Sequence, residues 1–209
     1  MVQAVKHFEL ISEGVDVQPA LDELRACDDL WNAHAVRKTA PGTPHAAMDD
    51  LWLRFNDVGP FERGERPWSE FSAEHTPVNY PAWQRLPSLR AIIFDLMRKV
   101  EAEALYGVLI TRIPPGGRIG KHVDDSWHVQ WTDKLYLSLK SAPGAVFGCD
   151  HEGVVEELNP RPGQVWLFDN RRAHWVENNS SEDRITLIVC VRTQMFGRHN
   201  ESDASRTAA

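Results

Sequence analysis

Hydrophobic residues recur with different periods along the chain, which divides it into a helical, loop-rich first half and a strand-rich second half. One apolar stripe follows the i, i+3, i+4, i+7 spacing of a helix and consists of Leu89, Ile92, Ile93, Leu96, Met97 and Val100. Ser88 directly precedes this stripe and is predicted to cap the helix. A second helix is predicted from Pro19, whose fixed φ suits a first helical turn, to Trp31. Both helices are expected to serve as scaffold.

From about residue 105 the hydrophobic period changes to two, the period of half-buried strands. The predicted strands cover residues 105–113, 134–140, 145–148, 154–158, 164–168, 174–177 and 184–191, separated by turns rich in Pro, Gly, Asn and Asp. Two more strands are predicted at 2–10 and 51–55. Short strands at this spacing indicate a mainly β protein, a sandwich or barrel with flanking helices.

Alternation along a strand sends successive side chains to opposite faces, which divides the last predicted strand into two sets. Thr186 shares a face with Arg184, whereas Ile185, Leu187 and Val189 lie on the other face. An arginine that points into a small barrel is a costly buried charge unless it binds an anion. The same alternation places Lys134 and Tyr136 on one face of their strand.

The first half also contains a long irregular segment, residues 58–81, that is rich in proline and aromatic residues. A loop of this length in a compact domain is usually a functional cover or a disordered segment. Its aromatic side chains favour an ordered cover that folds back on the domain, and with residues 32–55 it is expected to form the rim of a pocket. We predict one domain over 1–196, with a barrel core at about 105–192, support from 1–104 and a flexible tail at 197–209.

Composition excludes several classes of function. The 209 residues carry a formal net charge of -7, which argues against a general nucleic-acid binder. Cys27, Cys149 and Cys190 are odd in number and far apart, so neither a disulfide framework nor a structural zinc site is expected. The N-terminus lacks an apolar signal core and no run approaches the length of a membrane span, so we predict a cytoplasmic protein without membrane contact.

The candidate chemistry is concentrated at the end of the segment 111–124, where His122 and Asp124 stand one residue apart. In an extended chain these two side chains leave on the same face and can reach a common point. His174, far downstream, is the predicted third ligand. Two imidazoles and one carboxylate on one side of a metal form the facial triad of non-haem Fe(II) oxygenases. Arg184, at the start of the next strand, is a fixed cation that can hold an acidic cosubstrate.

The remaining histidines are weaker candidates. His128 and His151 have no carboxylate at the two-residue spacing and are expected to be exposed turn residues. His34, His45 and His75 fall in the loop-rich half, where they can border a substrate pocket or simply lie at the surface.

Five motifs together resemble the aspartyl/asparaginyl β-hydroxylase-like branch of the Fe(II)/2-oxoglutarate-dependent oxygenases. They cover residues 51–56, 112–124, 134–139, 162–170 and 174–189. The resemblance implies a double-stranded β-helix, a jelly-roll or cupin-like barrel. It matches His122 and His174 to the iron-binding histidines and Arg184 to the arginine that pairs with the distal carboxylate of 2-oxoglutarate, assisted by the Thr111 hydroxyl.

Three positions differ from known members of the family. Lys134 and Tyr136 stand where the family has an arginine and a histidine near the other end of the cosubstrate, and Asp124 stands where the best-known animal members have glycine. The carboxylate of Asp124 therefore predicts a full three-ligand iron site.

The resemblance implies a hydroxylase that uses Fe(II), 2-oxoglutarate and O2, with release of succinate and CO2. We expect its substrate to be an amino acid or an Asp-, Asn- or Pro-type residue of a peptide, and we expect no nucleic-acid partner. The sequence does not select among these substrates or fix the oligomeric state. Two alternatives remain open: a non-catalytic cupin-like binding or sensory module, and a nucleobase-oxidising oxygenase.

Overall fold

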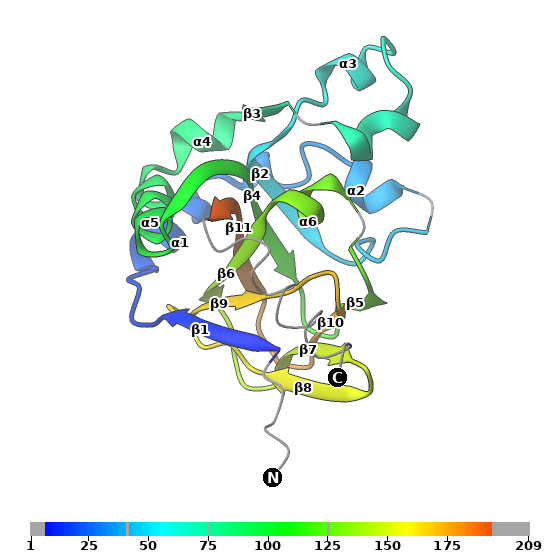
Figure 1. Cartoon of the computed structure of the whole chain (residues 1–209). Helices are drawn as coiled ribbons and strands as arrows, with labels where there is room; N and C mark the ends of the chain where they lie inside the picture. The colour runs from blue at the N-terminus through cyan, green and yellow to red at the C-terminus, as the bar shows by residue number, and fades with distance from the viewer. Residues whose placement is uncertain (1–6, 41, 75, 125, 194–209) are drawn as a thin grey trace.

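The computed structural model of this chain describes residues 7–40, 42–74, 76–124 and 126–193 (Figure 1). The predicted tail at 197–209 and the first residues of the strand predicted at 2–10 lie outside these residues. The expected division into helical and strand-rich halves is confirmed, since most helices precede residue 100 and most strands follow it.

Eleven strands form two antiparallel sheets within the described residues. In spatial order, the larger sheet consists of β1 (Phe8–Ser12), β9 (Val165–Phe168), β6 (Asp133–Lys140), β11 (Arg184–Thr193), β4 (Ala102–Ile113), β2 (Asp49–Asn56) and β3 (Pro77–Asn79). The smaller sheet consists of β5 (Arg118–His122), β10 (Ala173–Asn178), β7 (Ala145–His151) and β8 (Val154–Leu158). All seven strands predicted after residue 105 are present. Sequence reasoning missed β5, which is short and mostly exposed.

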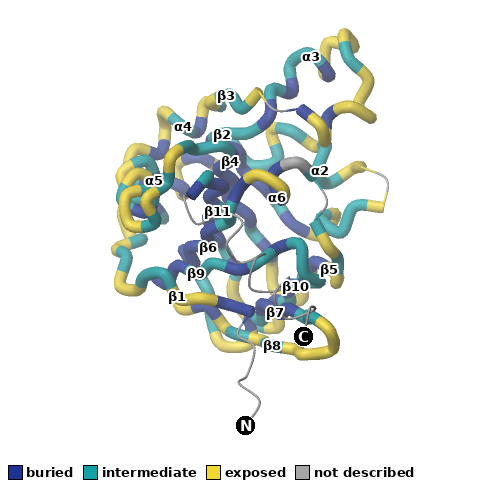
Figure 2. The backbone as a smooth tube through the Cα atoms, in the orientation of Figure 1, coloured by how far each residue is buried: buried dark blue, intermediate teal, exposed yellow. Residues whose placement is uncertain are grey.

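The two faces of the larger sheet have different neighbours, as the alternation on β11 predicts. Leu187, Val189 and Val191 are fully buried against the flanking helices, together with Leu89 and Ile93 of α5. The side chains between them, at even-numbered positions of β11, face the smaller sheet. Figure 2 shows the central strands as the most deeply buried part of the chain. One face of the larger sheet thus stabilises the fold, and the other is free to carry chemistry.

The helices and helical turns are α1 (Gln18–Arg25), η1 (Asp28–Leu30), α2 (Val36–Thr39), α3 (Gly59–Glu62), η2 (Trp68–Ala73), α4 (Pro81–Arg85), α5 (Pro87–Lys99) and α6 (Trp127–Trp131). The prediction that Ser88 caps α5 is wrong, because the helix already begins at Pro87 and Leu86 is its N-cap. The Ser88 hydroxyl instead donates a hydrogen bond to Glu23 Oε1 at 2.6 Å and joins α5 to α1. The helix predicted from Pro19 to Trp31 is α1, which is shorter than predicted and ends at Arg25.

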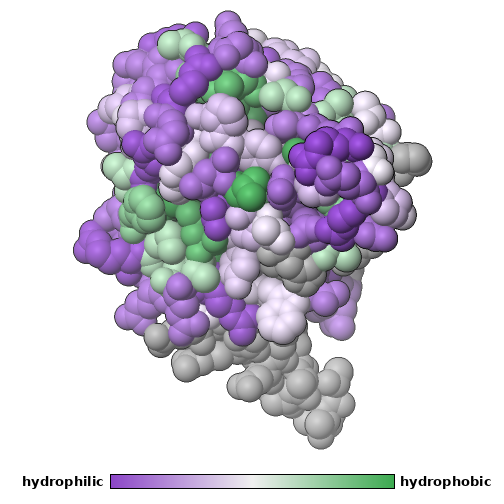
Figure 3. All heavy atoms as spheres, turned by 90° about the horizontal axis from the view of Figure 1, so that it is seen from above, coloured by the Kyte–Doolittle hydropathy of each residue, from purple (hydrophilic) through white to green (hydrophobic). Residues whose placement is uncertain are grey.

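The described residues of the segment 58–81, which are 58–74 and 76–81, fold back on the domain, as the aromatic content of the segment predicts. Phe61 and Phe71 are buried in a cluster with Trp52 of β2 and Leu109 of β4. Tyr80 closes the segment by donating a hydrogen bond from its hydroxyl to the Asn56 carbonyl at 2.6 Å. Figure 3 views the molecule from above, and hydrophilic side chains cover most of that face.

The three cysteines are free and buried, which confirms that they form no disulfide. None of the helices in the described ranges is long and apolar enough to cross a membrane.

Candidate active site

A cavity of about 470 Å³ lies between the two sheets. The larger sheet contributes Thr111, Lys134, Tyr136, Arg184 and Thr186, and the smaller sheet contributes His122, Phe147, His174 and Val176. Asp124 follows β5, and the loop before β2 and the cover segment complete the wall with His45, Phe71 and Ser72. All seven residues that the sequence predicts for the site therefore line one cavity.

The turn between β4 and β5 sets the position of His122. Gly116 has a φ of 74°, which glycine adopts without strain, and its N–H donates to the Asn178 carbonyl at 2.7 Å. This hydrogen bond holds the turn against the end of β10, so β5 pairs with β10 in a register that puts His122 opposite His174. The centroids of the two imidazole rings are 4.3 Å apart. Two histidines separated by 52 positions in the sequence become neighbours through this one strand pairing.

Both imidazoles are oriented by the same kind of local contact. His122 Nδ1 lies 2.7 Å from the Gly120 carbonyl, and His174 Nδ1 lies 2.9 Å from the Arg172 carbonyl, in each case two residues earlier in the sequence. A carbonyl only accepts, so each Nδ1 carries the proton and each Nε2 presents a lone pair. Metal-binding histidines are commonly fixed in this way. Burial lowers the pKa of His174 to about 4, which keeps this ring neutral at physiological pH.

Asp124 is held by two donors at one of its oxygens. Lys134 Nζ lies 2.6 Å from Oδ2, and the Asn170 amide donates to the same oxygen at 2.7 Å. The other oxygen, Oδ1, is 3.5 Å from His122 Nε2. Burial by itself would raise the pKa of Asp124, but the neighbouring positive charge of Lys134, followed by the polar contact with His122, lowers it far below the ordinary range. The residue is a permanent carboxylate with one oxygen directed toward the imidazoles.

The donor atoms left free are two imidazole nitrogens and one carboxylate oxygen, which is the donor set of a facial Fe(II) site. The residues at hand therefore fit such a metal. The Asn170 carbonyl also accepts a hydrogen bond from the Asp124 N–H at 3.2 Å. Asn170 therefore holds both the backbone and the carboxylate of Asp124. Asn170 ends one of the sequence motifs, but nothing in its local pattern indicated this contact.

Arg184 is a buried cation with no hydrogen bond or ion pair to any other described residue. It is 4% exposed, and its guanidinium carbon lies 5.7 Å from the centre of the Phe147 ring. Burial lowers its pKa from the usual 12.5 to about 10, so it remains charged at neutral pH at a cost in free energy. Beside it, Thr186 pairs in register with Thr111, and the Thr186 hydroxyl is buried without a hydrogen-bond partner. This end of the cavity suits an anion with several acceptor oxygens.

Lys134 and Tyr136 face the cavity as predicted, but Lys134 is committed to Asp124. Lys134 is therefore paired with a carboxylate, whereas Arg184 has no carboxylate partner among the described residues. Burial raises the pKa of Tyr136, so its hydroxyl stays protonated.

His45 was predicted only as a residue of the loop-rich half, and the structure brings it beside His122 and Asp124. Ligand atoms of His45, His122 and Asp124 all lie within 4.8 Å of one another. His174 is not in that closest group, although its ring contacts that of His122. Burial lowers the pKa of His45 to about 3. No spacing pattern in the sequence signals this residue, because it approaches from a separate loop.

Two other histidine predictions are wrong. His128 is 4% exposed in α6, with its ring stacked on Phe55 at a centroid distance of 5.1 Å, because α6 folds onto the end of β2. His151 ends β7 and is half-buried beside His7.

Comparison with known proteins places this site in a family. The family described as "Aspartyl/Asparaginyl beta-hydroxylase" matches residues 33–194, which include every residue of the predicted site. A comparison with curated proteins finds none that matches.

Several solved structures share the fold at low sequence identity. An oxidoreductase of the 2OG-Fe(II) oxygenase family from Burkholderia pseudomallei has a TM-score of 0.55 and 18% identity over 89% of this chain and 84% of its own. A prolyl hydroxylase from Trichoplax adhaerens, in complex with a hypoxia-inducible-factor peptide fragment, has a TM-score of 0.58 and 12% identity over 90% and 84%. These likenesses show the double-stranded β-helix fold that the resemblance implied. Since the family match spans most of the sequence, the chain belongs to the aspartyl/asparaginyl β-hydroxylase family of 2-oxoglutarate-dependent oxygenases.

Proposed function

We propose that this oxygenase is an Fe(II)- and 2-oxoglutarate-dependent hydroxylase of an amino acid or of an Asp-, Asn- or Pro-type residue in a peptide. One observation carries the proposal: a single cavity contains the free donor atoms of His122, Asp124 and His174 together with the buried, unpaired cation Arg184. The first set suits the metal, and the cation suits a dicarboxylate.

Bound Fe(II), with 2-oxoglutarate and O2, supplies the oxidising chemistry that hydroxylates a C–H bond and releases succinate and CO2. The residues of the chain bind and orient these groups. His122 Nε2, His174 Nε2 and Asp124 Oδ1 would hold the metal on one side and leave the opposite positions open. Lys134 and Asn170 keep Asp124 ionised and fix the oxygen that it presents.

Arg184 would bind the distal carboxylate of the cosubstrate through charge-assisted hydrogen bonds, for which a planar guanidinium is well suited. The hydroxyls of Thr111 and Thr186 lie beside it as additional donors. The Thr186 hydroxyl gains a partner when a carboxylate enters, because it has none among the described residues. The anion thus compensates both a buried charge and a buried hydroxyl.

The substrate is proposed to enter between the loop before β2 and the cover segment, where Phe71 and Ser72 reach the cavity. The family name and the peptide complex of the Trichoplax prolyl hydroxylase support an amino-acid or peptide substrate. The chain has 30 acidic and 23 basic residues, and this acidic excess is unfavourable for binding the phosphate backbone of a nucleic acid.

The experiment that tests the proposal is succinate release from the metal-loaded protein with 2-oxoglutarate. Free amino acids, Asp-, Asn- and Pro-containing peptides, nucleobases and oligonucleotides are compared at moderate salt, with the His174→Ala variant as the inactive control. We expect stimulation by a member of the first two groups. Stimulation by oligonucleotides or nucleobases alone would replace the proposed substrate class, and the absence of Fe(II) or 2-oxoglutarate binding would favour a non-catalytic module.

A further inference from the structure

His45 reaches the metal site from a loop that belongs to neither sheet. The loop lies between α2 and β2, where the structure describes residue 40 and residues 42–48, and its histidine ring is perpendicular to the His122 ring at a centroid distance of 5.3 Å. Ligand atoms of His45, His122 and Asp124 are mutually within 4.8 Å, close enough for one metal ion to contact all three after small side-chain movements. His45 approaches from outside the pair of strands that carries His122 and His174.

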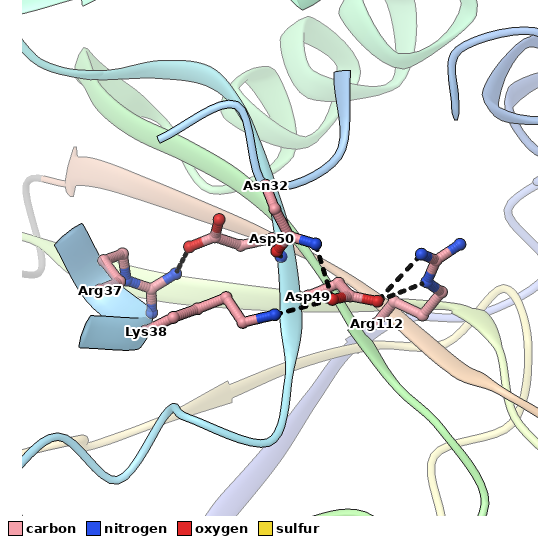
Figure 4. A network of polar contacts seen from close by, with 6 residues as sticks. All are labelled: Asn32, Arg37, Lys38, Asp49, Asp50 and Arg112. Atoms are coloured by element: carbon pink, nitrogen blue, oxygen red, sulfur yellow. Dashed lines mark hydrogen bonds and ion pairs between the residues drawn. The ribbon is translucent and has the colours of Figure 1, made fainter. Parts of the chain in front are cut away.

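Two ion pairs fix the ends of this loop. Arg37 Nη1 lies 3.0 Å from Asp50 Oδ2, and Lys38 Nζ lies 3.0 Å from Asp49 Oδ1, so residues before the loop are joined to residues after it (Figure 4). Asp50 is 1% exposed, which makes its pair with Arg37 a buried one. These contacts hold the end of α2 close to the start of β2, so the two ends of the loop lie side by side.

Within the loop, few contacts hold His45 itself. Its N–H donates to the Thr43 hydroxyl at 3.1 Å, and its carbonyl accepts from Met48 at 3.2 Å. The ring nitrogen Nδ1 is buried and has no hydrogen-bond partner among the described residues. Gly42, with a φ of 74°, gives the loop a backbone position that can change direction at low cost. The loop ends are therefore fixed, while its centre carries an imidazole that lacks a protein partner.

We propose that His45 is a fourth protein ligand of the metal, which occupies one open position until 2-oxoglutarate displaces it. This inference rests on the proposed function. A buried imidazole nitrogen without a partner gains one when it binds the metal. A facial site offers three open positions, of which a chelating keto acid takes two and O2 needs one. With His45 bound, a chelating keto acid would fill the two remaining positions and leave none for O2, so His45 must leave before O2 can bind. Its departure when 2-oxoglutarate enters would couple cosubstrate binding to exposure of the metal.

The test uses the whole protein with Co(II) in place of Fe(II). Co(II) moves the proton NMR signals of its ligands far from the ordinary range, and each coordinated imidazole contributes one N–H signal that disappears in D2O. We expect three such signals in the wild-type protein and two in His45→Gln, with about tenfold weaker Co(II) binding in the variant. Addition of 2-oxoglutarate to the wild type is expected to reduce three signals to two. The matched control His151→Ala removes a histidine outside the cavity and should retain three.

The possible outcomes separate this inference from the proposed function. Two signals in a wild-type protein that binds one Co(II) would overturn the role of His45 and leave the three-ligand site intact. Three signals that persist with 2-oxoglutarate bound would overturn the displacement. Failure of the wild type to bind Co(II) at all would overturn both. Because the decisive count is made on wild-type protein, the test does not depend on the variant folding.

Discussion

The ammonium of Lys134 lies 2.6 Å from the Oδ2 atom of Asp124, so the proposed carboxylate ligand of the metal is already paired with a cation of the neighbouring sheet. Both side chains are largely buried, with 13% and 21% of their surface exposed. Burial would lower the pKa of Lys134, but the carboxylate raises it above its ordinary value. The pair keeps the site electrostatically balanced before a metal arrives.

Replacing Lys134 by Met should destabilise the metal-free protein by about 3 kcal/mol, because it leaves a buried carboxylate without its cation. A bound metal ion replaces the lost charge, so metal affinity should be maintained or increased. Urea unfolding of the metal-free and metal-loaded forms measures both effects. The control Lys121→Met breaks an exposed pair with Asp150 and should cost at most about 1 kcal/mol. If Lys134 instead served the cosubstrate, its loss would weaken 2-oxoglutarate binding and leave the stability of the metal-free protein unchanged.

Replacing Arg184 by Met should have opposite effects on stability and on cosubstrate binding. The buried guanidinium is unpaired and its pKa is lowered to about 10, so removing it should stabilise the unliganded protein by about 1–3 kcal/mol. The same change should weaken 2-oxoglutarate binding by about 3–5 kcal/mol, because the distal carboxylate loses its partner. Thermal melting and calorimetric titration measure the two quantities. The control Arg192→Met, on the same strand but outside the cavity, should change neither quantity. If Arg184→Met bound 2-oxoglutarate as tightly as the wild type, another residue would have to bind the distal carboxylate.

Replacing Asn170 by Ala should lower metal affinity about 10–100-fold, because its amide fixes the orientation of Asp124. The fold should persist, since Asn170 lies in the turn after β9 and outside the main hydrophobic cluster. Titration with Fe(II) under anaerobic conditions gives the affinity, and circular dichroism confirms the fold. An affinity within twofold of the wild type would show that Lys134 alone is sufficient to position the carboxylate.

Replacing His122 or His174 by Ala should abolish stoichiometric Fe(II) binding and turnover while the protein remains folded. Each residue supplies an oriented imidazole nitrogen that no other residue of the two strands can replace. Metal content after gel filtration measures binding, with His151→Ala as the control that retains metal. Full activity in His174→Ala would contradict the assignment of the ligands and would direct attention to His45.

The sequence by itself determined the elements and the faces of the sheet. The period-two runs predicted seven of the eight strands from β4 to β11 and missed only β5, and the helical stripe predicted α5, because hydrophobic spacing directly reflects which side chains a regular element buries. Alternation on β11 correctly placed Arg184 and Thr186 toward the cavity and Leu187 and Val189 toward the helices. The two-residue spacing of His122 and Asp124 identified a shared face for the same reason.

Only the tertiary structure decided how those elements meet. The hydrogen bond that holds Gly116 against β10 sets the register that joins His122 to His174, and register depends on partners far apart in the sequence. Contacts between separate strands and loops decided that Lys134 and Asn170 hold Asp124 and that His45 lies beside His122 and Asp124. Local spacing carries no information about such contacts, because they depend on how loops close over the cavity and not on the period of any single element.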